Sequence, residues 1–94
     1  MLSFEWDEAN VGHIALHDVT PEEAEQVLRS PTLELEPEIT DGEERVAEVG
    51  QTRTGRILKV VVTVRGVKVR VVTAYDAGRS LKQAYLELLR GLYE

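Results

Sequence analysis

Two long runs of β-branched residues limit the folds open to this chain more than any other feature. They fill residues 56–75 and meet at Arg65-Gly66. If these two residues form the loop, Val64 lies opposite Val67, and the pairs Val62–Val69, Val60–Val71 and Leu58–Thr73 follow. This register predicts an antiparallel hairpin with one uninterrupted apolar face directed to the core.

The reverse face of this hairpin carries the basic residues Lys59, Lys68 and Arg70. Because successive side chains of a strand point to opposite faces, the three should emerge together on the less buried side. Two interpretations follow. The residues form a basic surface for a charged ligand, or they are solvating residues that keep an apolar hairpin from aggregating.

Helices are expected at both ends of the chain. Asp7 and Glu8 favour a helix start and predict a helix over 8–17. Thr20-Pro21-Glu22-Glu23 is a capping box with proline at the first helical position, and it predicts a second helix over 21–29. After Gly78, the capping pattern Ser80-Leu81-Lys82-Gln83 precedes apolar residues at helical spacing, which predicts a C-terminal helix.

Shorter strands complete the expected sheet. Alternating Leu and Glu residues over 33–38 predict one edge strand that ends at Pro37. A turn at Asp41-Gly42 precedes a strand over 45–49, and a further short strand over 3–6 is an option. The order predicts a single α+β domain over 1–94, with two N-terminal helices, a four-stranded antiparallel meander sheet and a C-terminal helix.

Charge is distributed unevenly along the sequence. The 94 residues carry 17 acidic and 11 basic side chains, and the net charge of −6 disfavours strong binding to a phosphate backbone. Residues 1–50 hold 14 acidic and 2 basic side chains, a balance of −12, whereas residues 51–94 have a balance of +6. The asymmetry indicates a charged partner for the basic half, or charges that interleave and cancel in space.

The residue content excludes several classes of site. Without cysteine there is no disulfide framework, thiolate zinc site or thiol nucleophile. The longest apolar run is far shorter than the ~20 residues of a membrane span, and the N-terminus lacks the features of a signal peptide, so we expect a cytoplasmic protein. His13 and His17 have metal-binding spacing, but no third ligand is evident, so we expect no metal and no cofactor.

Five segments carry a resemblance that extends over nearly the whole chain. They are Phe4-Glu5-Trp6-Asp7, His17-Asp18-Val19-Thr20-Pro21-Glu22-Glu23-Ala24, Gly42-Glu43-Glu44-Arg45, Gly55-Arg56 and Val69-Arg70-Val71-Val72-Thr73-Ala74-Tyr75-Asp76-Ala77. Together and in this order they resemble the signatures of the BrnT family, the toxins of a type II toxin–antitoxin system. The resemblance implies a RelE-like α+β fold, metal-independent RNA cleavage and an antitoxin partner with a ribbon-helix-helix domain.

The resemblance also implies roles for particular residues. In such enzymes the 2′-hydroxyl attacks the adjacent phosphate, basic side chains stabilise the developing charge, and other groups transfer protons. The matching catalytic positions are Arg45, Arg70 and Arg79 for the phosphate, with His17 or Tyr75 for proton transfer. The residues expected to bind further RNA phosphates are Arg56, Lys59, Lys68 and Lys82.

The chain departs from the family pattern at three places. In the C-terminal helix, where that pattern is rich in arginine, only Arg79, Lys82 and Arg90 remain. Asn10-Val11-Gly12 and Tyr75-Asp76-Ala77-Gly78 stand where related chains often carry basic residues. Two hypotheses follow: an RNA-cleaving toxin with full or weakened activity, or a non-catalytic module that binds a small antitoxin-like partner or self-associates. A homodimer and a heterotetramer with the antitoxin are both compatible with these hypotheses.

Overall fold

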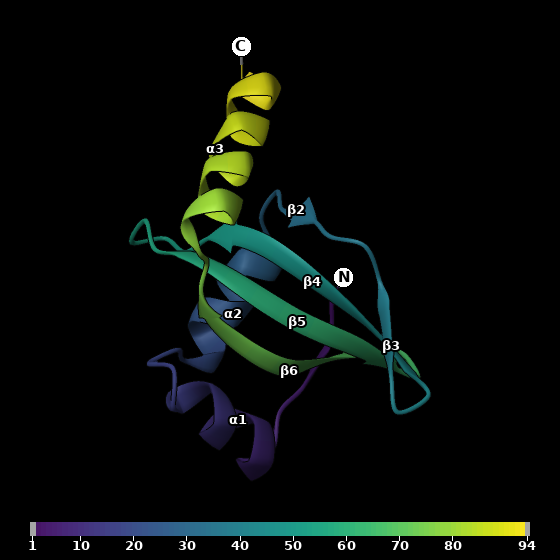
Figure 1. Cartoon of the computed structure of the whole chain (residues 1–94). Coiled ribbons are helices and arrows are strands. Elements are labelled where there is room, and N and C mark those ends of the chain that lie inside the picture. Colours follow the sequence, from purple (N-terminus) through teal and green to yellow (C-terminus); the bar gives the residue numbers. More distant parts are fainter. Residues whose placement is uncertain (1, 94) are drawn as a thin grey trace.

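The computed structural model describes residues 2–93 and shows three helices around one mixed sheet (Figure 1). In chain order the elements are β1 (Phe4–Glu5), α1 (Glu8–Ala15), α2 (Pro21–Leu28), β2 (Leu33–Glu34), β3 (Glu38–Thr40), β4 (Glu43–Gln51), β5 (Ile57–Arg65), β6 (Lys68–Asp76) and α3 (Arg79–Tyr93). The strand order is β1-β6-β5-β4-β2, and β3 pairs with the other end of β4. The α+β class expected from the sequence is confirmed.

Both N-terminal helices begin at the predicted caps. The Asp7 carboxylate accepts hydrogen bonds from the backbone N–H groups of Ala9 and Asn10, at 3.0 and 3.1 Å. Thr20 and Glu23 form a reciprocal capping box at the start of α2. Helix α1 ends at Ala15, two residues earlier than predicted, because the chain turns away and Asp18 adopts a positive φ of 59°.

The prediction of a four-stranded antiparallel sheet is wrong in two respects. Strand β1 adds to the edge of β6 in parallel orientation, which makes the sheet mixed and six-stranded. The expected strand over 33–38 is split into β2 and β3, which pair with opposite ends of β4. Pro37 separates them, since proline has no N–H to continue a ladder. The meander of β4, β5 and β6 is confirmed.

The β5–β6 hairpin forms, but its predicted register is wrong. The loop is Gly66-Val67, so Arg65 lies opposite Lys68. Gly66 has a φ of 63° at the first loop position, which is where a type II′ turn places glycine. A register shift follows, since Val62 pairs with Val71 whereas Val61 pairs with Thr73. Val72 is therefore the extra residue of a β-bulge.

The bulge determines which side chains of β6 face the core. Val71 and Ala74 are both fully buried, although strict alternation would put them on opposite faces. Thr73 and Tyr75 consequently lie on the other face, opposite Val61 and Lys59. The expectation that Thr73 faces the core is thus wrong.

The three helices cover different parts of the sheet. Ile14 of α1 and Val27 of α2 pack on Leu58 and other buried side chains of β5 and β6. Helix α3 rises from one end of the sheet (Figure 1), where Tyr85 packs on Val49 and Ile57. Within the described part of the chain, no helix is long and apolar enough to cross a membrane.

Candidate functional site

The face of the sheet opposite α1 and α2, here called the site face, carries Arg45, Lys59, Thr73 and Tyr75. Lys59 and Tyr75 are directly opposite in the β5–β6 ladder, and the Lys59 Nζ atom lies 5.8 Å from the centroid of the Tyr75 ring. That distance is within the range of a cation–π interaction. The bulge at Val72 puts Tyr75 beside this ammonium group rather than in the core.

Two histidines reach the site face around the part of the β6 edge that lies beyond its pairing with β1. His17 follows α1, and its ring lies edge-on to Tyr75 with 5.6 Å between the ring centroids. The His13 Nε2 atom is 3.1 Å from the Thr73 hydroxyl, and the two histidine rings are 5.8 Å apart. Both histidines are exposed. The fold therefore places an imidazole, a phenol and an ammonium group in a row across β6 and β5.

Two hollows lie on the site face, and Arg45 lines both. The smaller one has a volume of about 220 Å³ and is lined by Leu35, Glu36, Glu38, Thr40, Arg45, Ala47, Lys59, Val61 and Tyr75. The larger one has a volume of about 470 Å³ and includes His13, Arg65, Arg70 and Thr73 in its wall. Carboxylates and cations therefore face the same small cavity.

Arg45 keeps part of its guanidinium group available to a ligand. Its side chain is 31% exposed, and its Nε atom lies 3.3 Å from the Glu43 carboxylate. Among residues 2–93 this is the one ion pair of Arg45, and it engages Nε alone. The terminal nitrogens of Arg45 thus remain as donors beside the smaller hollow.

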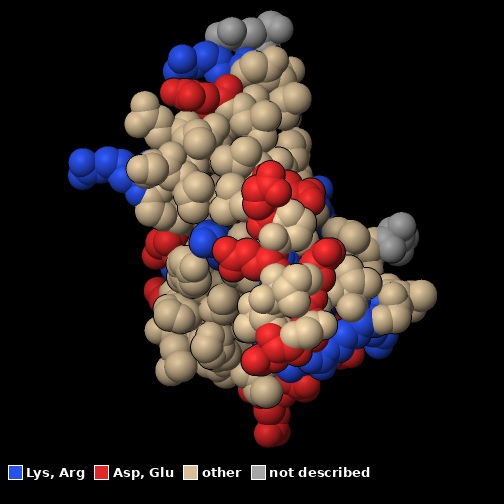
Figure 2. Space-filling model, turned by 45° about the vertical axis from the view of Figure 1, so that its right-hand side comes forward, with Lys and Arg blue, Asp and Glu red and all other residues tan. Residues whose placement is uncertain are grey.

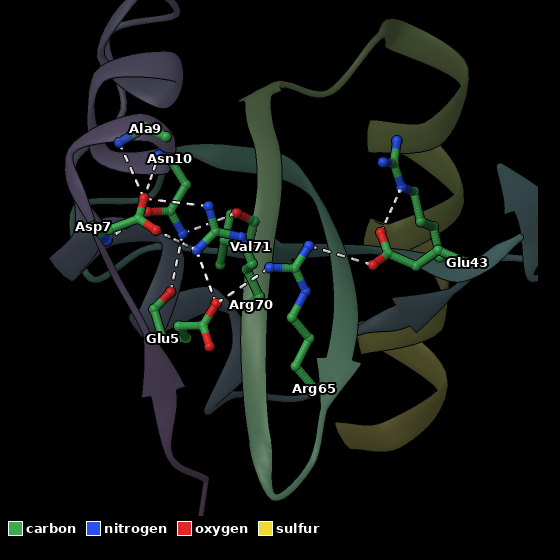
Figure 3. A network of polar contacts seen from close by, with 9 residues as sticks. Glu5, Asp7, Ala9, Asn10, Glu43, Arg65, Arg70 and Val71 are labelled. Atoms are coloured by element: carbon green, nitrogen blue, oxygen red, sulfur yellow. Dashed lines mark hydrogen bonds and ion pairs between the residues drawn. The ribbon is translucent and has the colours of Figure 1, made fainter. Parts of the chain in front are cut away.

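Arg70, in contrast, is held inside a network of carboxylates (Figure 3). Its Nη1 atom is 2.9 Å from both Glu5 and Asp7, and its side chain is only 13% exposed. The hydrogen bonds that Arg70 donates to Asp7 hold the pKa of Arg70 above its ordinary value, and Arg70 in turn lowers the pKa of Asp7. The amide of Asn10 completes the network by donating to the carbonyls of Glu5 and Val71. Arg70 therefore fastens β1 and the start of α1 to β6.

Arg56 is likewise held by carboxylates, at the other end of α1. Its Nε atom lies 2.9 Å from the Asp76 carboxylate, and its Nη1 atom lies 3.3 Å from Glu23. It also donates to the backbone carbonyls of His17 and Asp18. Hydrogen bonding to Asp76 raises the pKa of Arg56 and lowers that of Asp76. Arg56 thus fixes the segment that carries His17.

The other predicted phosphate ligands lie at the ends of the site face. Lys68 is exposed at the hairpin tip, opposite Arg65. Arg79 and Lys82 are exposed in the first turn of α3. Helix α3 begins at Arg79, so Ser80 is already helical and the predicted capping box is not the helix start. The nine predicted residues therefore separate into a central group, two fastened arginines and three peripheral cations. The central group is His17, Arg45, Lys59 and Tyr75.

Several groups near the site were not identified from the sequence. The sequence pattern predicts Glu36 and Glu38 only as polar positions of an edge strand. It places Thr73 on the core face of the hairpin. No residue type marks the bulge at Val72, so sequence alternation alone could not find Thr73. Among the described residues, no three His, Asp or Glu side chains come together as possible metal ligands.

Comparison with known proteins gives the family. A search of curated proteins found no match. A family model described as the ribonuclease toxin BrnT of a type II toxin–antitoxin system matches residues 6–80. This range includes every strand except β1 and all four residues of the central group. The chain therefore belongs to the BrnT family of type II toxin–antitoxin ribonuclease toxins.

Proposed function

We propose that this chain cleaves RNA on the site face, without a metal ion, by attack of the ribose 2′-hydroxyl on the adjacent phosphate. The observation that carries the proposal is the convergence of His17, Tyr75 and Lys59 from three separate segments. This arrangement occurs in a member of a ribonuclease-toxin family. An antitoxin partner is expected from the same membership.

Each central residue has a part in the proposed reaction. Lys59 and Arg45 donate to the phosphate oxygens, where negative charge grows in the transition state. The 2′-oxygen forms a bond to phosphorus while the bond to the 5′-oxygen breaks, and His17 gives a proton to that leaving oxygen. Tyr75 lies between His17 and Lys59 and orients the phosphate. The products are a 2′,3′-cyclic phosphate and a free 5′-hydroxyl.

The remaining predicted residues support this centre in two ways. Arg56 and Arg70 donate their hydrogen bonds to carboxylates, so we assign both to positioning. Arg56 positions the segment that carries His17, and Arg70 holds β1 and the start of α1 on β6. Lys68, Arg79 and Lys82 are exposed at the periphery, where they bind flanking phosphates of the RNA.

RNA cleavage in the presence of EDTA tests the proposal. We expect the purified protein to cut a labelled RNA and to leave a 2′,3′-cyclic phosphate. Arg45→Ala should lower kcat/KM by about 100-fold, as expected for the loss of a donor to developing charge. Arg53→Ala is the control, because it removes the same charge from an exposed position on the β4–β5 loop. Equal rates for wild type and Arg45→Ala would contradict the assignment.

The antitoxin partner is proposed to carry a ribbon-helix-helix domain and to bind the exposed end of α3. Leu86, Leu92 and Tyr93 of that helix are 45%, 56% and 76% exposed, which favours a protein contact there. Co-expression with a small ribbon-helix-helix protein, sought first in an adjacent reading frame, should yield a stable complex on size-exclusion chromatography. A complex without RNA cleavage by the free protein would support the alternative function, a non-catalytic interaction module. A dimer of this chain alone would indicate self-association.

A further inference from the structure

We infer that Glu38 is the general base of the reaction, the group that takes the proton from the attacking 2′-hydroxyl. The inference rests on the proposed function and assigns the one proton transfer that the central residues leave open. It depends on the position of Glu38, on the availability of its carboxylate and on the side of the site from which it acts.

The position of Glu38 is fixed by the β3–β4 hairpin. Glu38 lies directly opposite Arg45 in this antiparallel ladder, so both side chains are on the same face. The turn that sets the register is Asp41-Gly42, where both residues have a positive φ, of 52° and 76°. Glu38 and Arg45 line the small hollow together with Lys59 and Tyr75. A phosphate bound by Arg45 is therefore within reach of a carboxylate.

The Glu38 carboxylate is available as a proton acceptor. Within residues 2–93, Glu38 is exposed and forms no ion pair, and the carboxylate that pairs with Arg45 is that of Glu43. An ionised carboxylate can only accept, which is the property a base needs. Figure 2 shows carboxylates gathered on the side of the molecule where β2 and β3 lie, with Lys and Arg side chains beside them. The negative charge of the β2–β3 segment is thus adjacent to the site face.

Glu38 and His17 approach the site from opposite sides. His17 lies beside Tyr75 of β6, at one side of the sheet. Glu38 lies on β3 opposite Arg45, at the other side and four residues along β4 from Val49, the partner of Lys59. In-line displacement at phosphorus requires the attacking and leaving oxygens on opposite sides. With a phosphate held in the small hollow by Arg45 and Lys59, Glu38 takes the proton of the 2′-hydroxyl and His17 protonates the 5′-oxygen. One proton is taken and one is given, so no further reactant is needed.

A matched pair of variants tests this inference. Glu38→Gln and Glu34→Gln each remove one exposed negative charge from the acidic segment 33–38, but only Glu38 lines the small hollow and lies opposite Arg45. We expect Glu38→Gln to lower kcat by at least about 100-fold with KM changed less than about threefold. The acidic limb of the pH–rate profile, which a carboxylate base produces, should also disappear. Glu34→Gln should keep kcat within about threefold of wild type.

Three outcomes would overturn the inference. Glu38→Gln retains the wild-type kcat, both variants change kcat by the same factor, or the acidic limb survives in Glu38→Gln. An equal change in both variants would indicate a general effect of the acidic segment on RNA binding. Failure of the proposed function itself is a different result, since the wild type would then not cleave RNA. Thermal unfolding of both variants verifies that the exposed substitutions leave the fold intact.

Discussion

At the scale of single residues, Gly50 shows how closely α2 is packed on the sheet. Gly50 is buried in β4, and a β-carbon on it would point toward Val27 of α2. A β-carbon at this position would lie 2.9 Å from Cγ1 of Val27 and 3.1 Å from Cγ2 of Thr32. Both distances are shorter than ordinary carbon contacts, so only glycine fits here without a shift of α2.

The first prediction compares two glycine-to-alanine substitutions. Gly50→Ala should destabilise the protein by about 1–3 kcal/mol, because the added methyl group overpacks the core. Gly12→Ala should stabilise it by about 0.5–1 kcal/mol, because Gly12 is inside α1 and its β-carbon would meet nothing within 4 Å. Urea unfolding measures both. Similar effects of the two substitutions would contradict the packing argument.

At the scale of elements, the β-bulge in β6 decides the composition of the site face. One extra residue, Val72, shifts the register of β6 on β5 by one position between Val71 and Thr73. Buried Val71 and Ala74 can then both face the helices while Tyr75 joins Lys59. A central strand normally cannot gain or lose a residue, because every side chain beyond the change would move to the other face.

Deletion of Val72 should therefore be tolerated. The ladder then runs from Val71 directly to Thr73, and both keep their present partners on β5. We expect the deletion variant to fold with a Tm within about 5 °C of wild type, which corresponds to about 1 kcal/mol for a domain of this size. Deletion of Val61 from β5 is the control, since β5 has no extra residue there and its faces would invert. Unfolding of the first variant would show that the bulge is needed for the fold itself.

At the scale of the whole molecule, folding neutralises part of the uneven charge of the sequence. Arg70, Arg65 and Arg56 of the basic half pair with Glu5, Glu43 and Glu23 of the acidic half. The interpretation that the charges interleave is thus confirmed for these three arginines. Lys59, Lys68, Arg79 and Lys82 form no ion pair within residues 2–93 and remain as the positive charge that RNA could meet.

The Arg56–Asp76 pair predicts a loss of stability in acid. The pKa of Asp76 is lowered in the folded state, so its contribution is fully present above the unfolded pKa of about 3.9. It is lost as the pH falls through the folded value. Asp76→Asn should cost up to about 1 kcal/mol at pH 7, since the pair is partly exposed, and this difference should shrink toward pH 2.

Thermal unfolding between pH 7 and pH 2 measures this difference. Glu87→Gln on α3 is the control, because Glu87 is exposed and forms no ion pair within the described residues. A difference between wild type and Asp76→Asn that stays constant down to pH 2 would contradict the role of the ion pair.

The sequence by itself determined the features that depend on near neighbours. Asp7 and Thr20 start their helices through bonds to residues two or three positions away, and the Asp41-Gly42 turn needs only its own φ angles. The tertiary structure alone decided the parallel pairing of β1, the position of the bulge, and which arginines pair with carboxylates. Arg70 meets Asp7 across 63 positions of the chain, and a contact over that separation exists only after the strands between them have paired.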